Sequence, residues 1–240
     1  MSDNKITIII PVLNDVDALK MLLPQLQACR EQGHELLVID GGSSDGSIPF
    51  SRNLVDRILM TGVGRGRQMN LGAENASHNI LLFLHADSRI SDQCLEELLA
   101  AMSESCNHWG RFDVQLDQPG FSYSVIAAMM NLRSRLSGVS TGDQGMFVRR
   151  EIFHRVGGFQ SISLMEDIAL SKALRKHSRP VCLSSKLLTS ARRWQQQGIV
   201  KTIFLMWSLR LAYFLGANPD KLAEIYYPAA AESSNGQADK

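Results

Sequence analysis

Acidic and histidine side chains follow an apolar stretch in the first half of this sequence, where they are placed to hold a ligand. Residues 80–84 are all apolar, and His85, Ala86, Asp87 and Ser88 come next. A hard divalent cation prefers carboxylate oxygens and also accepts phosphate oxygens from a substrate, so Asp87 is a candidate metal ligand. A histidine beside it suits Mn²⁺ better than Mg²⁺. The alternative for His85 is a structural hydrogen bond at the end of a strand.

A second apolar stretch, residues 35–40, ends in Asp40 and opens a loop of small and hydroxyl-bearing residues that contains Asp45. A carboxylate at a strand end can accept hydrogen bonds from the base or ribose of a nucleoside. The alternative is an Asx turn closed by Asp45. The sequence contains neither the glycine pattern of a dinucleotide-binding loop after its first strand nor a P-loop, which excludes those two classes of phosphate site.

Arginines and a second pair of acids complete the set of candidate functional residues. Arg65 and Arg67 precede an expected helix, so guanidinium groups and helix N–H groups together can bind a diphosphate; two solvated arginines are the alternative. Glu166 and Asp167 begin another expected helix and offer a general base, or simply favour the helix dipole. Residues 193–194, Arg-Trp, offer a cation and a stacking face to a sugar or pyrophosphate, or ordinary packing.

The elements that must position these side chains alternate between strand and helix, which predicts an α/β fold with a mostly parallel sheet and right-handed crossovers. Ligands bind such sheets beyond the carboxyl ends of the strands, where the candidate residues lie. We expect Arg111, Asp113 and Gln115 to point outward from their strand, and Pro24 to kink its helix or start a second one. Strands are expected at 5–12, 35–40, 56–60, 80–84, 109–116, 145–149, 180–183 and 187–190, and helices at 16–29, 70–76, 91–102, 122–136, 151–156, 166–176 and 199–217.

The composition is that of an ordinary globular protein. With 25 basic and 24 acidic residues the net charge is +1, which gives no argument for nucleic acid as a partner. Four cysteines are scattered without metal-site or disulfide-framework spacing, so a reducing cytoplasm is expected. The N-terminal apolar stretch contains Pro11 and continues into Asn14 and Asp15, which favours a strand over a signal peptide. We find no internal repeat and no linker.

Residues 199–217 are more apolar than the rest of the chain but contain Lys201 and Arg210. We expect a core or interface helix, with a membrane-surface helix second and a membrane span third. Residues 229–240 are expected to be disordered. The apolar helix would present a face to a partner subunit, as in a homodimer, or to a lipid-phase acceptor at the inner face of a membrane; this face comprises Ile203, Phe204, Met206, Trp207, Leu211, Tyr213 and Phe214.

Seven motifs in this order closely resemble family 2 glycosyltransferases of the GT-A fold, in particular a bacterial branch associated with radical-SAM and selenium-related domains whose members also carry His-Ala-Asp. The motifs cover about residues 5–195. They are IIPVLND at 9–15, VIDGGSSDGS at 38–47, GRGRQMNLGA at 64–73, LHADS at 84–88, GDQG at 142–145, MED at 165–167 and RW at 193–194.

The resemblance implies a Rossmann-like, mostly parallel central sheet flanked by helices, with a C-terminal helical segment. A single domain would span residues 1–228, with a nucleotide-binding part at about 1–90, an acceptor part at about 91–195 and the apolar helix at about 198–217. The implied activity is an inverting, metal-dependent transfer of a sugar from a UDP- or GDP-linked donor to an acceptor hydroxyl. The implied cofactor is Mn²⁺ or Mg²⁺.

The resemblance also assigns roles to individual residues. Asp40 would read the base, Asp45 and Arg65 would contact ribose or phosphate, and Asp87 would anchor the cation, with His85 as a possible second ligand. Asp167 would be the base, with Glu166 beside it. The remaining donor-binding residues would be Pro11, Asn14, Asp15, Gly41, Ser43 and Ala86, and those on the acceptor or pyrophosphate side Asp143, Gln144, Arg193 and Trp194.

The sequence departs from the family pattern at three places. His85 stands where a carboxylate is usual, Asp15 where glutamate is frequent, and residues 190–194 lack the glutamine of processive members, which implies a non-processive enzyme. Two other functions remain open. One is a catalytically weak nucleotide-sugar-binding or scaffold protein of the same fold. The other is a nucleotidyltransferase, which is disfavoured because the first strand is not followed by a glycine-rich basic loop.

Overall fold

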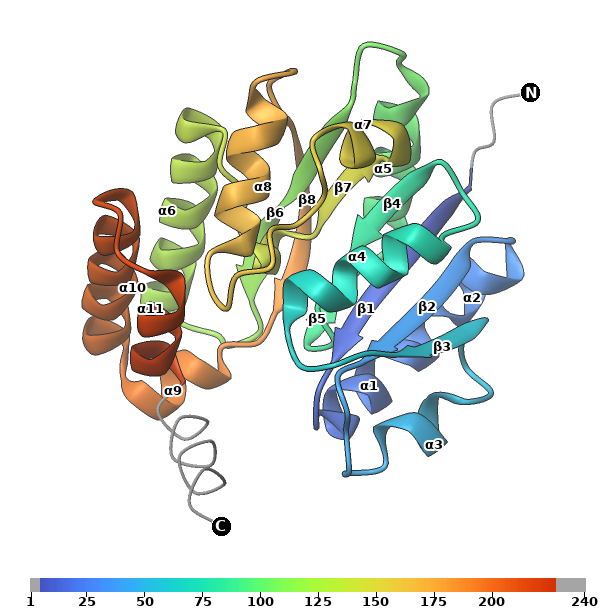
Figure 1. The fold of residues 1–240 in the computed structure, drawn as a ribbon, viewed down its shortest axis with the longest axis horizontal. Helices are drawn as coiled ribbons and strands as arrows, with labels where there is room; N and C mark the ends of the chain where they lie inside the picture. The colour runs from blue at the N-terminus through green and yellow to red at the C-terminus, as the bar shows by residue number, and fades with distance from the viewer. Residues whose placement is uncertain (1–4, 228–240) are drawn as a thin grey trace.

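The computed structural model describes residues 5–227 and shows a central eight-stranded sheet with helices on both faces (Figure 1). The strand order is β3-β2-β1-β4-β7-β6-β8-β5. The expectation of disorder for residues 229–240 lies outside the described residues. The strands are β1 (Ile6–Val12), β2 (Glu35–Asp40), β3 (Arg57–Met60), β4 (Ile80–Phe83), β5 (Ser88–Arg89), β6 (Trp109–Leu116), β7 (Met146–Arg149) and β8 (Val181–Thr189).

The N-terminal half of the sheet is parallel, with β3, β2, β1 and β4 side by side. Because successive side chains of a strand point to opposite faces, β1 contributes to two cores. Ile8 and Ile10 pack on one face with α1 (Val16–Leu22) and α5 (Asp92–Ser103), whereas Ile9 packs on the other with α4 (Arg65–Asn75), α7 (Arg150–Arg155) and α8 (Glu166–Arg175). This arrangement confirms the predicted α/β fold with a Rossmann-like sheet.

Close packing of α4 on β1 depends on a glycine. A Cβ atom added to Gly72 would lie 2.4 Å from Cγ2 of Ile9, far inside a normal contact. The helix begins at Arg65, five residues before the predicted start, because Gly64, with a φ of 138°, ends the preceding loop. Arg65 is therefore the first residue of the helix rather than part of a loop.

The helix predicted at 16–29 is divided at Pro24 into α1, η1 (Leu23–Leu26) and α2 (Gln27–Glu31). Proline lacks the N–H needed inside a helix and is tolerated at a helix start, which is where Pro24 lies in η1. The break keeps Leu19, Leu22 and Leu26 buried against the sheet.

The C-terminal half of the sheet is mixed: β7 is antiparallel to β4 and β6, and β8 is parallel to β6. The prediction of two strands at 180–183 and 187–190 is wrong, because β8 runs continuously with a register shift opposite Phe112 and Asp113. Such an irregularity inserts extra residues without ending the ladder.

The expectation that Arg111 points outward is also wrong, since its side chain is fully buried. Helix α6 (Phe121–Ser137) covers that part of β6. There the Arg111 guanidinium donates to the carbonyls of Phe112 and Asn131 and pairs with Asp113. A buried charge paired and hydrogen-bonded in this way is tolerated.

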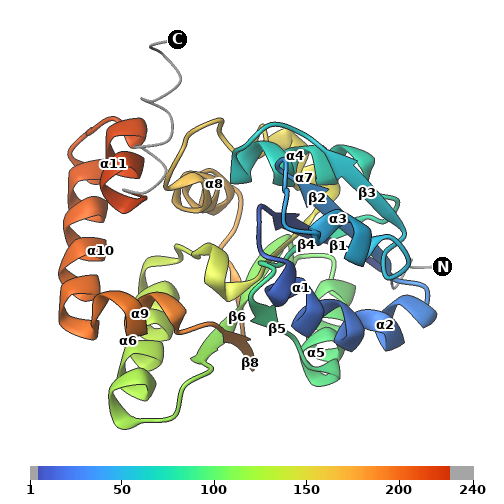
Figure 2. The same cartoon turned by 90° about the horizontal axis from the view of Figure 1, so that it is seen from below.

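The C-terminal residues form a helical layer beside the sheet, next to α6 and α8 (Figure 2). The predicted helix 199–217 corresponds to α10 (Ile199–Phe214), preceded by α9 (Arg192–Gln197) and followed by α11 (Pro219–Tyr226), which was not predicted. Leu209 and Leu222 pack with Leu164 and Ile168 at the start of α8. Two short helices complete the described fold, α3 (Ser47–Ser51) and η2 (Gly142–Gln144).

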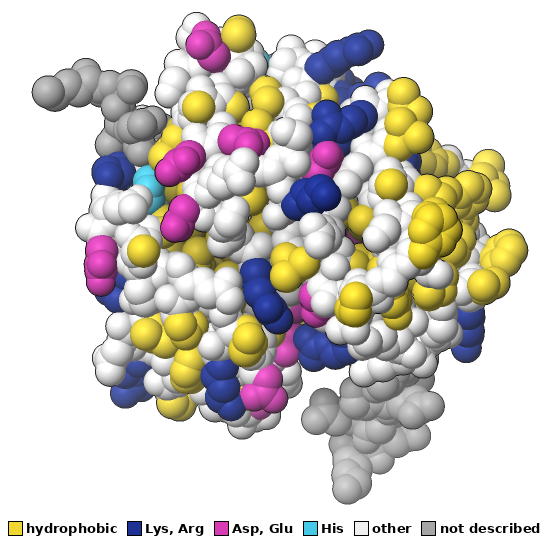
Figure 3. Space-filling model, turned by 180° about the vertical axis from the view of Figure 1, so that it is seen from behind, with side chains coloured by type: hydrophobic (Ala, Val, Ile, Leu, Met, Phe, Trp, Pro, Cys, Tyr) yellow, Lys and Arg dark blue, Asp and Glu magenta, His cyan; other side chains and the backbone are white. Residues whose placement is uncertain are grey.

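Large apolar side chains of α6 and α10 remain exposed along one side of the molecule (Figure 3). Phe121 and Leu136 of α6 are 85% and 80% exposed, and Phe204 and Trp207 of α10 are 72% and 64% exposed. Between residues 5 and 227, no helix has the length and hydropathy required to cross a membrane.

Candidate active site

A cavity of about 650 Å³ lies beyond the carboxyl ends of β1 and β4. This is the usual place for a ligand in a sheet of this type, and the volume is typical of a site for a drug-sized ligand. After the role that the resemblance implies for its residues, we call it the donor cavity. Its walls come from the end of β1, the start of α4, residues 85–87, residues 163–166 and α11, and its polar lining residues are Asp15, Arg65, Gln68, His85, Asp87, Ser163, Glu166, Asp220, Glu224 and Tyr227.

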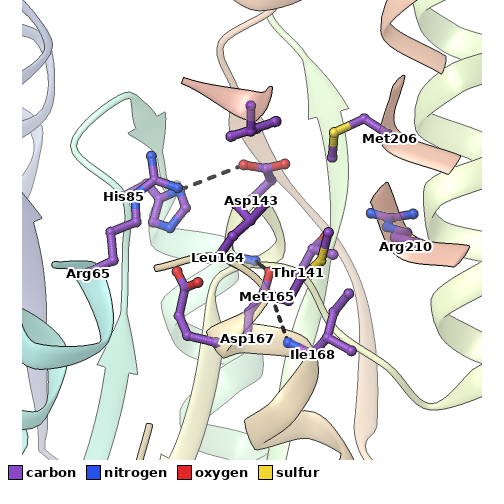
Figure 4. A pocket seen from close by; sticks show the side chains of 13 residues that line it. Arg65, His85, Thr141, Asp143, Leu164, Met165, Asp167, Ile168, Met206 and Arg210 are labelled. Carbon is purple, nitrogen blue, oxygen red and sulfur yellow. Dashed lines mark hydrogen bonds and ion pairs between the residues drawn. The ribbon is translucent and has the colours of Figure 1, made fainter. Parts of the chain in front are cut away.

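A smaller cavity of about 60 Å³ adjoins the donor cavity and shares Arg65, His85, Leu164 and Glu166 with it. After the role that the resemblance implies for Asp143 and Asp167, we call it the acceptor cavity. Asp143 and Asp167 line it from η2 and α8, and Met206 and Arg210 line it from α10 (Figure 4). The two acids predicted at the start of α8 therefore lie beside the histidine that follows β4.

Two loops beside the donor cavity are fixed to each other by hydrogen bonds. The backbone N–H of Asn14 donates to the Ser43 hydroxyl, and its side-chain oxygen accepts from the N–H of Ser44. Asn14 adopts a left-handed conformation with a φ of 50°, which asparagine tolerates better than most residues. Asn14 and Ser43 thus join the two loops beside the donor cavity, and neither residue lines it.

Asp40 and Asp45 both support the loop between them. One Asp40 oxygen accepts from the N–H groups of Gly42 and Ser43, whereas the other is buried and has no hydrogen bond among the described residues. The Asp45 carboxylate accepts from Ser47 and from the N–H of Val16, and the Ser47 hydroxyl leads the interactions that lower its pKa. The Asx turn closed by Asp45, given above as the alternative, is therefore present. One carboxylate oxygen of Asp40 has no hydrogen-bond donor among the described residues. Gly41 lies against Gln68, whose amide donates to the carbonyls of Val12 and Ile39.

His85 is directed toward Asp143. Its Nδ1 lies 3.6 Å from the Asp143 carboxylate, and its ring lies so close to Gly142 that an added Cβ there would be 2.4 Å from Nε2 (Figure 4). Burial opposes ionisation of Asp143, but the contact with His85 and the charges of Arg65 and Arg193 lower its pKa. His85 and Asp87 both line the donor cavity. Because β4 ends at Phe83 and a turn follows, His85 and Asp87 do not lie on one extended strand.

Asp87 has no hydrogen bond or ion pair with another described residue, and partial burial raises its pKa. Its carboxylate therefore lacks a compensating positive group in direct contact. Within residues 5–227, no three His, Cys, Asp or Glu side chains are grouped to hold a metal. A cation at Asp87 would thus take its other ligands from a substrate or water, as Mg²⁺ frequently does beside phosphates.

Glu166 and Asp167 occupy the first turn of α8 in different environments. Glu166 is 7% exposed, and burial together with the Asp167 charge raises its pKa to about 7. Burial also raises the pKa of Asp167, although its carboxylate accepts from the N–H groups of Gly142 and Ile168. Met165 precedes them with a φ of 71°, a strained conformation that is characteristic of functional sites.

The predicted arginines have different positions. Arg65 lines both cavities, whereas Arg67 is exposed and lines neither. Gly66 lets the start of α4 approach the 159–160 segment, because a Cβ there would lie 2.8 Å from the carbonyl of Gln160.

The predicted acceptor-side residues Gln144, Arg193 and Trp194 make contacts within the fold. The side chain of Gln144 closes a capping box with Thr141, and Trp194 packs with Leu116 and Ile126. Arg193 stacks on Tyr226, with its guanidinium carbon 3.8 Å from the ring centroid. None of these three side chains lines either cavity.

Sequence reasoning missed two contributors to the site. Arg192, next to the predicted Arg193, forms an ion pair of 3.1 Å with Asp15. Helix α11 supplies Asp220 and Glu224 to the donor cavity, and Tyr227, directly after the helix, also lines it. The start of α11 carries a recognisable signal, Asn218 as N-cap followed by a proline.

Comparison with known proteins matches residues 7–162 to the model of the family described as glycosyl transferase family 2. Over 157 residues, the chain is 26% identical to an undecaprenyl-phosphate 4-deoxy-4-formamido-L-arabinose transferase of Proteus mirabilis (strain HI4320), covering 61% of this chain and 48% of that protein. The chain therefore spans about half the length of this relative.

Two solved structures share the fold. TarS of S. aureus in complex with UDP-GlcNAc has a TM-score of 0.62 at 20% identity, covering 78% of this chain and 58% of that one. Glucosyl-3-phosphoglycerate synthase of Mycobacterium tuberculosis, in complex with Mn²⁺, UDP and glucosyl-3-phosphoglycerate, has a TM-score of 0.58 at 14% identity, covering 77% and 70%.

Proposed function

The chain belongs to glycosyl transferase family 2, and from this premise we propose that it transfers a sugar from a nucleotide-diphosphate sugar to an acceptor hydroxyl. The observation that carries the proposal is the junction of the two cavities. Arg65 and the unpaired Asp87 line the donor cavity, and Glu166 connects it to the acceptor cavity that Asp167 lines. The test is calorimetry with nucleoside diphosphates, followed by an assay of donor turnover.

We infer that the donor nucleotide is UDP. Structural neighbours crystallised with UDP or UDP-GlcNAc support this inference. Binding of GDP but not UDP would overturn it. Pro11 and Asp15 line the same cavity, and Asn14, Gly41, Ser43 and Asp45 support its loops.

We propose that a divalent cation assists the reaction and that Asp87 holds it together with diphosphate oxygens. The lone, partly buried carboxylate fits such an ion, and the Mn²⁺-containing neighbour supports it. When bound, the cation would neutralise the charge that develops on the leaving diphosphate. His85 has its Nδ1 near Asp143, so we assign it an orienting role beside the ion rather than that of a main ligand.

The proposed reaction is a single in-line displacement that inverts the anomeric carbon. The acceptor oxygen forms a bond to that carbon, the bond to the diphosphate oxygen breaks, and Asp167 takes the acceptor proton. The N–H of Gly142 orients the Asp167 carboxylate. Arg65 stabilises the leaving diphosphate more in the transition state, where it gains negative charge, than in the ground state. This difference lowers the barrier. Glu166 lies between the two cavities and next to Asp167, and its charge state affects both cavities.

We propose a non-processive enzyme, because residues 190–194 lack the glutamine of processive members and Trp194 lies outside both cavities. A catalytically weak nucleotide-sugar-binding protein is the second candidate, favoured by the absence of a grouped metal site within residues 5–227. Binding of UDP without turnover of any donor would support this second function.

We also propose that the exposed face of α6 and α10 docks on an anionic lipid bilayer at the inner side of the membrane. The charge of the residues in and around α6 and α10 supports an anionic bilayer as the partner of this face. Residues 118–142 and 190–219 contain no Asp or Glu, and Arg135 and Lys201 are exposed there. Exposed aromatic side chains with surrounding cations are typical of a surface that binds acidic lipids. The relative from Proteus, named for an undecaprenyl-phosphate substrate, supports a lipid-linked acceptor.

A further inference from the structure

Arg210 lines the acceptor cavity and Arg133 lies near two of its acids, Asp143 and Asp167, and both arginines have buried guanidinium nitrogens without a partner in the described part of the chain. Arg210 of α10 lines the cavity together with Asp143 and Asp167, and its Nε is buried and unpaired (Figure 4). Nε and Nη2 of Arg133 on α6 are likewise buried and unpaired. Buried donors are nearly always hydrogen-bonded in folded proteins, so two such groups at one site need an explanation.

Neighbouring arginines pair their terminal guanidinium nitrogens within the fold. Arg111 and Arg135 both pair with Asp113. By contrast, Arg133 makes no ion pair among residues 5–227 even though it is near enough to Asp167 and Asp143 to interact with their charges. Burial lowers the pKa of Arg133, and these two acids offset part of that effect. Nε of Arg111 is also unpaired, but both of its terminal nitrogens have partners, whereas Nη2 of Arg133 has none among residues 5–227.

We propose that Arg133 and Arg210 form a binding site for a phosphate group carried by the acceptor. Guanidinium groups bind phosphate oxygens through paired N–H donors, and two of them from different helices can fix its orientation. The site deepens the proposed function and rests on it. It lies beside Asp167, so a bound phosphate would hold a nearby acceptor hydroxyl at the base. Arg65 lines both cavities, whereas Arg210 lines only the acceptor cavity.

The acceptor phosphate has two chemical sources, the headgroup of a lipid or a soluble phosphorylated molecule. Met206 and Arg210 line the cavity from the same helix that exposes Phe204 and Trp207 on its outer side. A lipid phosphate would thus reach the site along α10. Farnesyl phosphate and inorganic phosphate serve as probes for the two sources.

The experiment must keep phosphate out of the donor cavity. Wild-type protein is saturated with UDP and Mn²⁺, and each probe is then titrated by calorimetry. We expect Arg133→Gln and Arg210→Gln each to weaken binding of farnesyl phosphate about tenfold or more, because each removes a charge-assisted hydrogen bond. Arg155→Gln is the matched control, since Arg155 is exposed on α7 and lines neither cavity. The Arg155→Gln variant should bind farnesyl phosphate as tightly as wild type does.

Arg133→Lys and Arg210→Lys retain the charge and guard against loss of folding, and thermal unfolding checks each variant. Partial binding by the Lys variants supports the site. Much weaker binding of inorganic phosphate than of farnesyl phosphate identifies a lipid acceptor, and equal binding identifies a soluble one. Folded Gln variants that bind farnesyl phosphate as wild type does, or an equal loss in Arg155→Gln, would overturn the site.

If UDP itself does not bind, the proposed function fails separately. The same titrations are then made on nucleotide-free protein in an Arg65→Gln background, which removes the donor-side arginine. A tenfold loss on adding Arg210→Gln would still support the phosphate site, and no loss would overturn it.

Discussion

The imidazole of His85 lies 3.6 Å from the carboxylate of Asp143, so the residue that occupies the usual position of a metal-binding acid is directed at an acid across the site. This pair joins the wall after β4 to η2, and through Gly142 to Asp167. The wall of the donor cavity and the proposed base, Asp167, are thereby held in a fixed relative position.

The double variant His85→Asp/Asp143→Asn should increase the affinity of UDP in the presence of Mn²⁺. The new carboxylate supplies a second oxygen ligand, and the Asn removes the repulsion that Asp143 would otherwise exert on it. We expect an increase of about tenfold by calorimetry, the size of one added charge-assisted interaction. The single variant His85→Asp is the control and should gain less. No gain in the double variant would show that the cation does not approach residue 85.

Asp167→Asn should reduce transfer by about 10²–10⁴-fold, because it removes the base but preserves the size of the side chain. Affinity for UDP should remain within a factor of about two, since Asp167 lines only the acceptor cavity. Initial rates and calorimetry on the same preparation separate the two effects. A variant that retains full transfer would remove Asp167 from the proposed role.

Glu166 should make the stability of the ligand-free protein dependent on pH. Its pKa in the folded state, about 7, lies above its ordinary value of 4.5, so the folded state holds this proton more tightly than the unfolded state. The stabilisation that this bound proton gives to the folded state is complete below about pH 4.5 and is lost as the pH rises through 7. Glu166→Gln should therefore gain stability relative to wild type between pH 5 and pH 8, by on the order of 2 kcal/mol.

Urea unfolding of both proteins at the two pH values measures this difference. Glu74→Gln, a change at an acid on the exposed part of α4, is the control and should show no such trend. An equal stability difference at pH 5 and pH 8 would contradict the buried, proton-holding state of Glu166.

Phe204→Ser/Trp207→Ser should abolish binding to vesicles that contain phosphatidylglycerol, because it removes two exposed aromatic side chains from the α10 face. Co-sedimentation measures binding, with vesicles of phosphatidylcholine alone as the neutral comparison. Met21→Ser, which removes an apolar side chain 51% exposed on α1, should bind normally. A wild-type protein that ignores both vesicles but dimerises through this face would replace the membrane by a second copy of the chain.

The strand ends and the acids that follow them could be predicted from the sequence, because apolar stretches that stop at Asp40 and at His85 define both the sheet and its functional edge. The burial of Arg111 could not, since it depends on α6 covering β6 and on a register shift that no local pattern indicates. The pairing of Arg192 with Asp15 spans 177 positions, so only the tertiary fold reveals it. Helix α11 was predictable from its N-cap and proline.

The most direct test of the central claim is the release of nucleoside diphosphate from a panel of UDP- and GDP-linked sugars in the presence of Mn²⁺, with wild-type protein and Asp87→Asn. We predict that wild-type protein turns over at least one UDP-sugar and that Asp87→Asn lowers the rate about 100-fold or more, because the cation loses its protein carboxylate. Turnover of none of the donors by wild-type protein, or equal rates for the two proteins, would contradict the account.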